Sequence, residues 1–237
     1  MILVFYLFVL TIDLQEEHFV ETVTGLTGEL TEKRLLKELM LSYQEMGVLG
    51  RPVNESNPSV EVKIGISLVQ ILGINEKSQV LTTNVWITLE WNDTFLKWNK
   101  QEWQGIGELR IKSDQIWTPD IVLYNFADER IKQARDVFAV VKNEGKVEWM
   151  PPAILKSTCK IDITMFPFDV QICFIKLGSW TYSENLLNIS QLDEGLKLND
   201  YTESNEWTIL HYTTQRFAKT YSCCADLSYP DFHYFFA

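Results

Sequence analysis

The hydrophobic pattern of the chain has two periods, and the first one is helical. Between residues 31 and 46 apolar side chains recur every three or four positions, which is the spacing of one face of an α-helix. Thr31 is suited to cap the start of this helix, and Gly47, Gly50 and Pro52 are suited to end it. The pattern predicts one amphipathic helix with an apolar stripe made of Leu35, Leu36, Leu39, Met40 and Tyr43.

The second period is two, and it begins after residue 52. Val60 and Val62 are apolar, Glu61 and Lys63 are charged, and the alternation continues to Leu68, which is typical of a half-buried strand. Similar segments, separated by turn signals, lie near residues 80–91, 121–124, 137–142, 146–150, 153–164, 170–177, 206–221 and 229–236. We therefore predict a mainly β protein, an antiparallel immunoglobulin-like β-sandwich of about ten strands with one N-terminal α-helix.

One strand carries a tryptophan on its polar side. The apolar face of residues 81–91 consists of Leu81, Val85, Ile87, Leu89 and Trp91. Trp86 lies on the opposite face, between Asn84 and Thr88. A tryptophan in that place either packs against a loop or contacts a partner, because tryptophan is favoured at interfaces and binding sites. The phase of the strand leaves both interpretations open.

Composition limits the partner of this chain. It has 237 residues, 46% of them hydrophobic, which is enough for the core of a single large β domain. The formal net charge of -11 would repel the phosphates of a nucleic acid and attract cations. The three histidines, His18, His211 and His233, are far apart in sequence, and no CxxC spacing is present. We therefore expect no nucleic-acid partner and no zinc site.

Other features indicate an oxidising, extracellular compartment. The chain has four cysteines, together with three N-glycosylation sequons that begin at Asn54, Asn92 and Asn188. The long apolar run over residues 2–10 is too short to span a bilayer and is typical of the core of a signal peptide. We interpret residues 1–24 as a possible signal peptide and N-terminal lead.

Cys223 and Cys224 are adjacent and lie between Tyr221 and Tyr229. A bond between adjacent cysteines closes a ring too small for relaxed disulfide geometry, so it would strain and stiffen the tip of a hairpin. The two tyrosines would then present aromatic faces across a small gap, which is half of a cage for an organic cation. Alternatively, each cysteine pairs elsewhere and the tyrosines are ordinary strand residues, and this segment alone does not decide between the two.

Cys159 and Cys173 enclose thirteen residues. A bond between them would stabilise the fold by about 3 kcal/mol in the chain-entropy model. The loop has an apolar tip, Met-Phe-Pro-Phe over residues 165–168, which a free surface loop would normally not expose. We therefore expect this tip to dock on another surface.

Four motifs in a fixed order give the chain a resemblance to a known family. The Cys-x13-Cys loop with Phe-Pro-Phe-Asp at residues 166–169 resembles the signature loop of the Cys-loop, or pentameric ligand-gated, ion channels. The pair Cys223–Cys224 resembles the mark of alpha-type nicotinic acetylcholine receptor subunits. Residues 117–120 (Trp-Thr-Pro-Asp) are similar to the WxPD element of the family, and residues 178–182 (Gly-Ser-Trp-Thr-Tyr) to its central binding-loop tryptophan segment. The resemblance runs from residue 31 to residue 236, and implies that residues 25–237 form an extracellular ligand-binding domain.

The resemblance also implies a binding site between two subunits. One subunit supplies a principal face that surrounds an ammonium group with aromatic rings, and the neighbouring subunit supplies a complementary face. The implied principal face consists of Tyr124, Trp180, Tyr221, Cys223, Cys224 and Tyr229, and the implied complementary face of Trp86, Val140, Glu148 and Met150. Glu148 departs from the usual neutral residue, so we expect it to alter ligand preference. The implied disulfides are Cys159–Cys173 and Cys223–Cys224.

In this family the ligand opens a pore. The resemblance implies acetylcholine or a related ammonium ligand, a pentamer of identical or homologous subunits, and closure of the 221–229 hairpin that gates a cation channel. Family subunits continue into four membrane helices, which are absent from this chain, and a loop docks on them. The implied coupling residues are Phe166, Pro167, Phe168 and Asp169. We expect the domain at the extracellular face of the plasma membrane. The alternative is a secreted, soluble acetylcholine-binding protein without a pore, but the apolar loop tip favours the receptor.

Functions of another class have less support. The chain has no nucleophile elbow, HExxH motif or Gly-rich phosphate loop, so we expect neither an enzyme nor a cofactor. An adhesion domain would explain a sandwich but not the four ordered aromatic residues. The acidic side chains near residues 193–206 could hold calcium, although we interpret them as a solvated loop without a metal. They are Asp193, Glu194, Asp200, Glu203 and Glu206.

Overall fold

The computed structural model describes residues 31–53, 59–127, 137–166 and 168–237. The first described element is a helix over residues 31–46, as the helical period predicts, and Leu35 and Tyr43 on its apolar stripe are buried. The helix ends at Gly47, whose φ of 88° lies in the left-handed region that favours glycine. The predicted signal peptide lies outside the described residues. Within the described part of the chain, no helix has both the length and the hydropathy to cross a bilayer.

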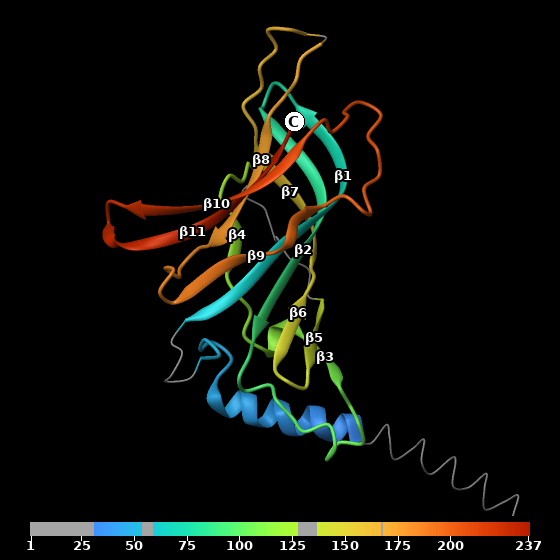
Figure 1. Cartoon of the computed structure of the whole chain (residues 1–237), viewed down its shortest axis with the longest axis vertical. Helices are drawn as coiled ribbons and strands as arrows, with labels where there is room; N and C mark the ends of the chain where they lie inside the picture. Colours follow the sequence, from blue (N-terminus) through green and yellow to red (C-terminus); the bar gives the residue numbers. More distant parts are fainter. Residues whose placement is uncertain (1–30, 54–58, 128–136, 167) are drawn as a thin grey trace, which may run out of the picture.

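The larger of two sheets forms one layer of a sandwich (Figure 1). Its seven strands are β1 (Val60–Asn75), β2 (Val80–Asn92), β3 (Glu108–Lys112), β5 (Phe138–Lys142), β6 (Lys146–Trp149), β7 (Pro152–Thr158) and β9 (Leu187–Lys197). The order is β3-β5-β6-β2-β1-β9, and β7 also pairs with β2. The strands pair antiparallel except β1 and β9, which run parallel.

The smaller sheet carries a long hairpin. Its four strands are β4 (Ile121–Leu123), β8 (Cys173–Ser179), β10 (Tyr212–Tyr221) and β11 (Cys224–Phe236), in the order β10-β11-β8-β4. All the pairs in this sheet are antiparallel. The tip of the hairpin between β10 and β11 projects sideways from the sandwich (Figure 1).

Alternating side chains of both sheets form the core. Along β2 the predicted apolar face is buried, and Trp86 on the opposite face is only half-buried, so the predicted phase of this strand is confirmed. Trp91 of β2 contacts Trp117 edge to face, and Tyr234 of β11 is fully buried. The two layers and the leading helix confirm the predicted sandwich.

A buried polar contact joins the helix to the sheet. The Tyr43 hydroxyl donates to Oδ2 of Asp93 over 2.7 Å and accepts from the Trp117 backbone N–H over 3.0 Å. The other oxygen of Asp93 accepts from the Phe95 N–H. Burial raises the pKa of Asp93 above its ordinary value, although the bond from Tyr43 lowers it. The contact therefore fixes the helix at the point where β2 ends.

The structure differs from the predicted pattern in three ways. The periodicity analysis misses β3, which has only five residues, and β9, in which Asp193 and Gly195 have positive φ angles that break the alternation. The parallel pairing of β1 with β9 is an exception to the predicted antiparallel sandwich. The strands predicted over 153–164 and 170–177 are too long, because the chain leaves the sheets between Thr158 and Cys173 to form a loop.

Candidate functional site

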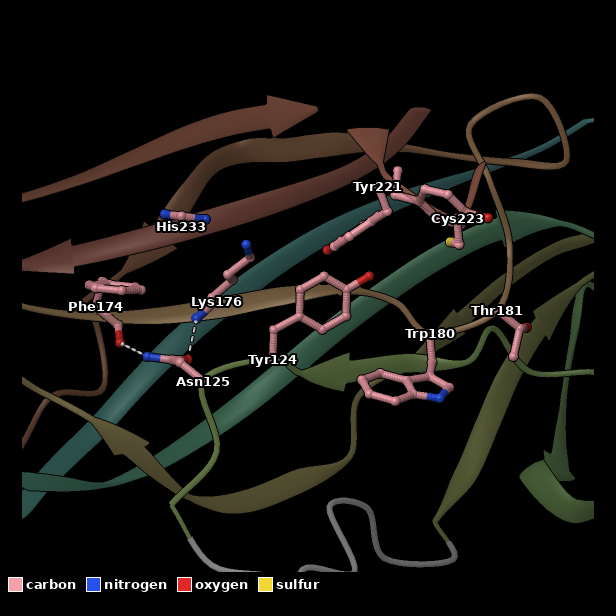
Figure 2. A pocket seen from close by; sticks show the side chains of 10 residues that line it. Tyr124, Asn125, Phe174, Lys176, Trp180, Thr181, Tyr221, Cys223 and His233 are labelled. Carbon is pink, nitrogen blue, oxygen red and sulfur yellow. Dashed lines mark hydrogen bonds between the residues drawn. The ribbon is translucent and has the colours of Figure 1, made fainter. Parts of the chain in front are cut away.

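A cavity of about 580 Å³ opens between the tip of the β10–β11 hairpin and the strands β4 and β8 (Figure 2). Among the described residues, no Asp or Glu side chain lines it. Five of the six residues predicted for the principal face do line it, namely Tyr124, Trp180, Tyr221, Cys223 and Tyr229. Segments about a hundred residues apart in sequence thus meet at one cavity.

The aromatic rings in this cavity form two edge-to-face pairs. The Tyr124 and Trp180 centroids are 6.1 Å apart with a 69° angle between the rings, and those of Tyr221 and Tyr229 are 5.6 Å apart at 70°. The first pair belongs to the segments that follow β4 and β8, and the second to the hairpin. The Trp180 side chain is 63% exposed, although it is the largest apolar group in the cavity. A large aromatic ring left this open is suited to contact a ligand.

Hydrogen bonds to Asp120 hold the segment that carries Trp180. The Asp120 carboxylate accepts from the Ser179 hydroxyl over 2.6 Å, and from the backbone N–H and hydroxyl of Thr181 over 2.7 and 2.6 Å. The backbone N–H of Trp180 donates to the backbone carbonyl oxygen of Asp120 over 3.1 Å. The last residue of the Trp-Thr-Pro-Asp motif therefore positions Trp180. The motif itself was the sequence signal for this role, but only the structure shows what the aspartate bonds.

Tyr124 lies at the centre of the cavity (Figure 2). Its hydroxyl donates to the carbonyl oxygen of Ser179, and the Nζ atom of Lys176 lies 5.3 Å from its ring centroid. Burial, followed by nearby acidic groups, raises the pKa of Tyr124, so the phenol is neutral near pH 7. Tyr124 therefore presents a neutral ring to the cavity.

Five cavity residues were not among the predicted site residues, namely Asn125, Phe174, Lys176, His233 and, next to Trp180, Thr181. Asn125 accepts from the Lys176 backbone N–H over 3.0 Å and donates to the Phe174 carbonyl oxygen over 2.9 Å, so it joins the end of β4 to β8 (Figure 2). Lys176 forms an ion pair of 3.0 Å with the buried Asp231. The end of the cavity opposite Trp180 is formed by Asn125, Phe174, Lys176 and His233 (Figure 2).

The predicted bond between Cys223 and Cys224 is not formed in this structure. Both are free thiols, and their Sγ atoms are 2.6 Å apart, beyond the S–S bond length of about 2.05 Å. Cys223 lies at the turn of the hairpin and lines the cavity, and Cys224 begins β11 beside it. The two cysteines are adjacent at the hairpin turn, and the vicinal disulfide between them stays a prediction.

Of the four residues predicted for the complementary face, three lie on the larger sheet and Met150 directly follows one of its strands, and none of the four lines the cavity. Val140 of β5 is directly opposite Glu148 of β6, and Trp86 lies on β2. Met150, just after β6, is 52% exposed. Within a single chain, the predicted principal face and the predicted complementary face therefore lie apart.

Glu148 lies in a row of charges. It accepts from Lys142 over 2.8 Å and pairs with Lys146 at 3.1 Å, and Lys146 also pairs with Glu90 at 2.8 Å. The bond from Lys142 is the largest of the influences that lower the pKa of Glu148, so the carboxylate is ionised near pH 7. Its charge is offset by two lysines.

The loop between Cys159 and Cys173 is closed by the predicted disulfide. Its tip is apolar and open to solvent, since Phe166 is 69% and Phe168 is 88% exposed. Pro167 lies outside the described residues, and Asp169 accepts from the Gln171 side chain. The exposure of the tip agrees with a docking surface.

Two of the three predicted glycosylation sequons lie within the described residues. Asn92 is exposed, Asn188 is half-buried and accepts from Arg216 over 3.0 Å, and Asn54 lies outside the described residues. In the described residues, no three His, Cys, Asp or Glu side chains are grouped as they would be to hold a metal ion. Glycosylation of these sites stays a prediction.

Comparisons with known proteins identify the family of this chain and agree with its fold. The family model of the neurotransmitter-gated ion-channel ligand binding domain matches residues 32–237. Neuronal acetylcholine receptor subunit alpha-2 from Homo sapiens is 44% identical over 206 residues, which cover 87% of this chain and 38% of that protein. Acetylcholine receptor subunit alpha-L1 from Schistocerca gregaria is 43% identical over 208 residues, covering 84% of this chain and 37% of that protein. The chain thus spans well under half the length of these relatives.

A solved structure shares the fold. It is that of the Capitella teleta AChBP in complex with lobeline, with a TM-score of 0.78 and 32% sequence identity, and the similarity covers 87% of this chain and 96% of that chain. The sandwich, the leading helix and the closed Cys159–Cys173 loop are all in place. This chain belongs to the family of neurotransmitter-gated ion-channel ligand-binding domains.

Proposed function

We propose that this domain binds acetylcholine or a related ammonium ligand in the cavity beneath the β10–β11 hairpin. The observation that carries the proposal is the group of four aromatic side chains, Tyr124, Trp180, Tyr221 and Tyr229, around a cavity that no Asp or Glu of the described residues lines. Each aromatic face attracts a cation by about 0.5 to 2 kcal/mol, without the desolvation cost of burying a carboxylate. Because the family is one of ligand-gated channels, the domain is not an enzyme, and the proposal needs no cofactor.

The complete site requires a second subunit. Trp86, Val140 and Glu148 lie on the larger sheet and Met150 directly follows one of its strands, away from the cavity of their own chain. A neighbouring copy in a ring of five identical or homologous subunits would place this face against the open side of the cavity. Trp86 is half-buried on the polar face of its strand, which suits a residue that a neighbour covers.

Ligand binding would act through the hairpin. Closure of the hairpin over the cation favours the arrangement that binds it better, and this differential affinity is what shifts the equilibrium. β11 pairs with β8, and Phe236 of β11 lies opposite Cys173, where the disulfide-closed loop ends. The exposed tip at Phe166 and Phe168 would dock on a transmembrane domain and gate a cation channel at the extracellular face of the plasma membrane.

The second candidate is a secreted acetylcholine-binding protein without a pore. The observation that favours it is the similarity to the Capitella protein, which this chain covers almost completely. The exposed phenylalanines of the loop tip favour the receptor instead. Replacing Phe166 and Phe168 with serine separates the two, since a channel would lose its response to agonist with binding retained, whereas a soluble protein would keep every property.

A complementation experiment tests the shared site. Trp180→Ala damages the principal face and Trp86→Ala the complementary face, so we expect neither variant alone to bind labelled acetylcholine at the level of the unchanged protein. Coexpression of the two should restore binding, because some interfaces then combine an intact Trp180 with an intact Trp86. Mass measurement of the purified oligomer checks assembly. Absence of restored binding in a properly assembled oligomer would contradict a site between subunits.

The vicinal disulfide has a test of its own. Alkylation of the unreduced, denatured protein labels free thiols, so a bonded Cys223–Cys224 pair would leave the protein unlabelled and two free thiols would take two labels. We expect no label in protein produced in an oxidising compartment. Two labels on the peptide that contains Tyr221 and Tyr229 would show that the pair remains reduced.

A further inference from the structure

His233 faces the cavity from β11 but is not part of the aromatic cage. Its ring stacks on Phe174 at 5.2 Å with an 8° angle, and lies 4.4 Å from Phe217 and 5.8 Å from Phe235, measured between centroids. The side chain is 17% exposed. His233 is thus a titratable side chain held between three aromatic rings at the edge of the cavity.

The polar end of this histidine contacts a buried carboxylate. Nε2 of His233 lies 2.8 Å from Oδ1 of Asp231, and Nζ of Lys176 lies 3.0 Å from Oδ2 of the same residue. The Asp231 side chain is only 1% exposed. Burial by itself would raise the pKa of Asp231, but the contacts with His233 and Lys176 outweigh it and hold that pKa below its ordinary value. One buried negative charge is therefore shared by two basic side chains.

The same contacts lead to the cage. Nζ of Lys176 lies over the Tyr124 ring at 5.3 Å, and that ring meets Trp180 at 6.1 Å. Figure 2 shows Lys176 between His233 and Tyr124 along the cavity wall. A change in the ion pair between Lys176 and Asp231 therefore affects the Tyr124 ring, beside Trp180, through direct contacts.

We propose that His233 is a positioning residue of the ligand site, which acts through Asp231 and Lys176 and weakens the binding of an ammonium ligand when it is protonated. The inference rests on the proposed function. With His233 neutral, the charges of Lys176 and Asp231 balance. A proton on His233 adds a positive charge to the cavity wall and competes with Lys176 for Asp231, so that both effects oppose a bound cation.

The other groups around His233 leave this balance unchanged. From β8 the neighbouring groups are Phe174 and Lys176, and from β10 they are Phe217 and Gln215, the residue opposite His233. The tyrosine that follows β4 has a raised pKa and stays neutral. Further along β10, Nζ of Lys219 lies 5.0 Å from the centroid of the Tyr221 ring.

The test measures affinity against pH with a ligand of fixed charge. Labelled acetylcholine is a quaternary ammonium compound, so its own charge does not vary. For the assembled protein we expect affinity to be about fivefold weaker at about pH 5.5 than at about pH 8. His233→Gln, which keeps a polar side chain but cannot become charged, should bind equally at both values. The matched control is His211→Gln, an exposed histidine near the start of β10, which should keep the fivefold difference.

Each outcome decides one of the two claims. Absence of binding by the unchanged protein at pH 8 would overturn the proposed function. Binding at pH 8 with no pH dependence, or with the same dependence in His233→Gln, would overturn the role of His233 alone. If His233→Gln does not fold, calorimetry of the unchanged protein in two buffers of different ionisation enthalpy replaces it. Binding near pH 6.5 should then release protons, because linkage is reciprocal, and no release would overturn the inference.

Discussion

Two edge-to-face aromatic pairs in this chain have similar geometry and opposite surroundings. Trp91 and Trp117 have centroids 5.9 Å apart with an 83° angle, and Tyr124 and Trp180 have centroids 6.1 Å apart with a 69° angle. Trp91 is 3% exposed and Trp180 is 63% exposed. The first pair gains its contact free energy when the chain folds. The second retains exposed aromatic surface that a ligand can cover, so burial, not ring geometry, decides which pair serves the fold and which serves binding.

The two pairs are also held in place differently. Packing between the sheets fixes Trp91. By contrast, Trp180 is fixed through its backbone, because Asp120 bonds the residues before and after it and leaves the indole ring free. Stability and binding can therefore be changed separately in this molecule, which makes the comparison open to experiment.

The largest effect is expected from Trp91→Ala. Removal of a large buried ring leaves a cavity in the core, and the free energy of unfolding should fall by about 3–5 kcal/mol. The measurement is chemical denaturation followed by circular dichroism, with Trp91→Phe as the control that keeps an aromatic ring and loses less. A loss below about 1 kcal/mol would show that the pair is not a core contact.

Trp180→Ala changes the exposed pair instead of the buried one, and its effect should be the next largest. The ring is exposed, so the free energy of unfolding should change little, whereas affinity for acetylcholine should fall about 100-fold as an aromatic face and its covered surface are lost. Equilibrium binding and denaturation of the same preparation give both numbers, and Trp180→Phe should recover part of the affinity. If Trp180→Ala bound acetylcholine as tightly as the unchanged protein, the assignment of the exposed pair to binding would be wrong.

The sequence was informative for the cage because motifs carry it. Tyr124, Trp180, Tyr221 and Tyr229 each lie in a short pattern with unusual residues around it, and the phase of β2 placed Trp86 on the polar face of its strand. Helix, hairpin tip and most strands followed from periodicity. β9 did not, because positive φ angles at two positions interrupt the alternation on which a strand prediction depends.

The polar end of the cavity was beyond prediction for a different reason. Phe174 and Lys176 alternate with buried residues along β8, so the pattern indicates a face toward solvent. Periodicity cannot show that the β10–β11 hairpin lies across this face, or that Asp231 and His233 meet Lys176 there. Such contacts depend on the pairing of strands more than fifty residues apart, which a local pattern does not contain.

Tyr43→Phe probes the buried side with a smaller, pH-dependent effect. It removes the hydroxyl that forms hydrogen bonds with Asp93 and Trp117, so we expect the free energy of unfolding to fall by about 1–2 kcal/mol near pH 7. The folded-state pKa of Asp93 is already raised, and without the Tyr43 bond it rises further. A group with a raised folded pKa favours the native state below its unfolded pKa and loses that contribution as pH rises through the folded value. The loss should therefore be smaller near pH 4 than near pH 7, as measured by denaturation at each pH, and Tyr212→Phe on the exposed face of β10 should show no such trend.

Tyr221→Phe should have the smallest effect and sharpens the comparison most. Tyr221 meets Tyr229 edge to face in the hairpin, and its side chain is 37% exposed. If the cage works through ring faces, removing the hydroxyl should change acetylcholine affinity less than about threefold, whereas Tyr221→Ala should weaken it by about tenfold or more. Competition binding on both variants gives the ratio. A large loss in Tyr221→Phe would mean that the hydroxyl bonds the ligand or the hairpin, and that this pair, like the contact of Tyr43 with Asp93, depends on a polar bond rather than on an open aromatic face.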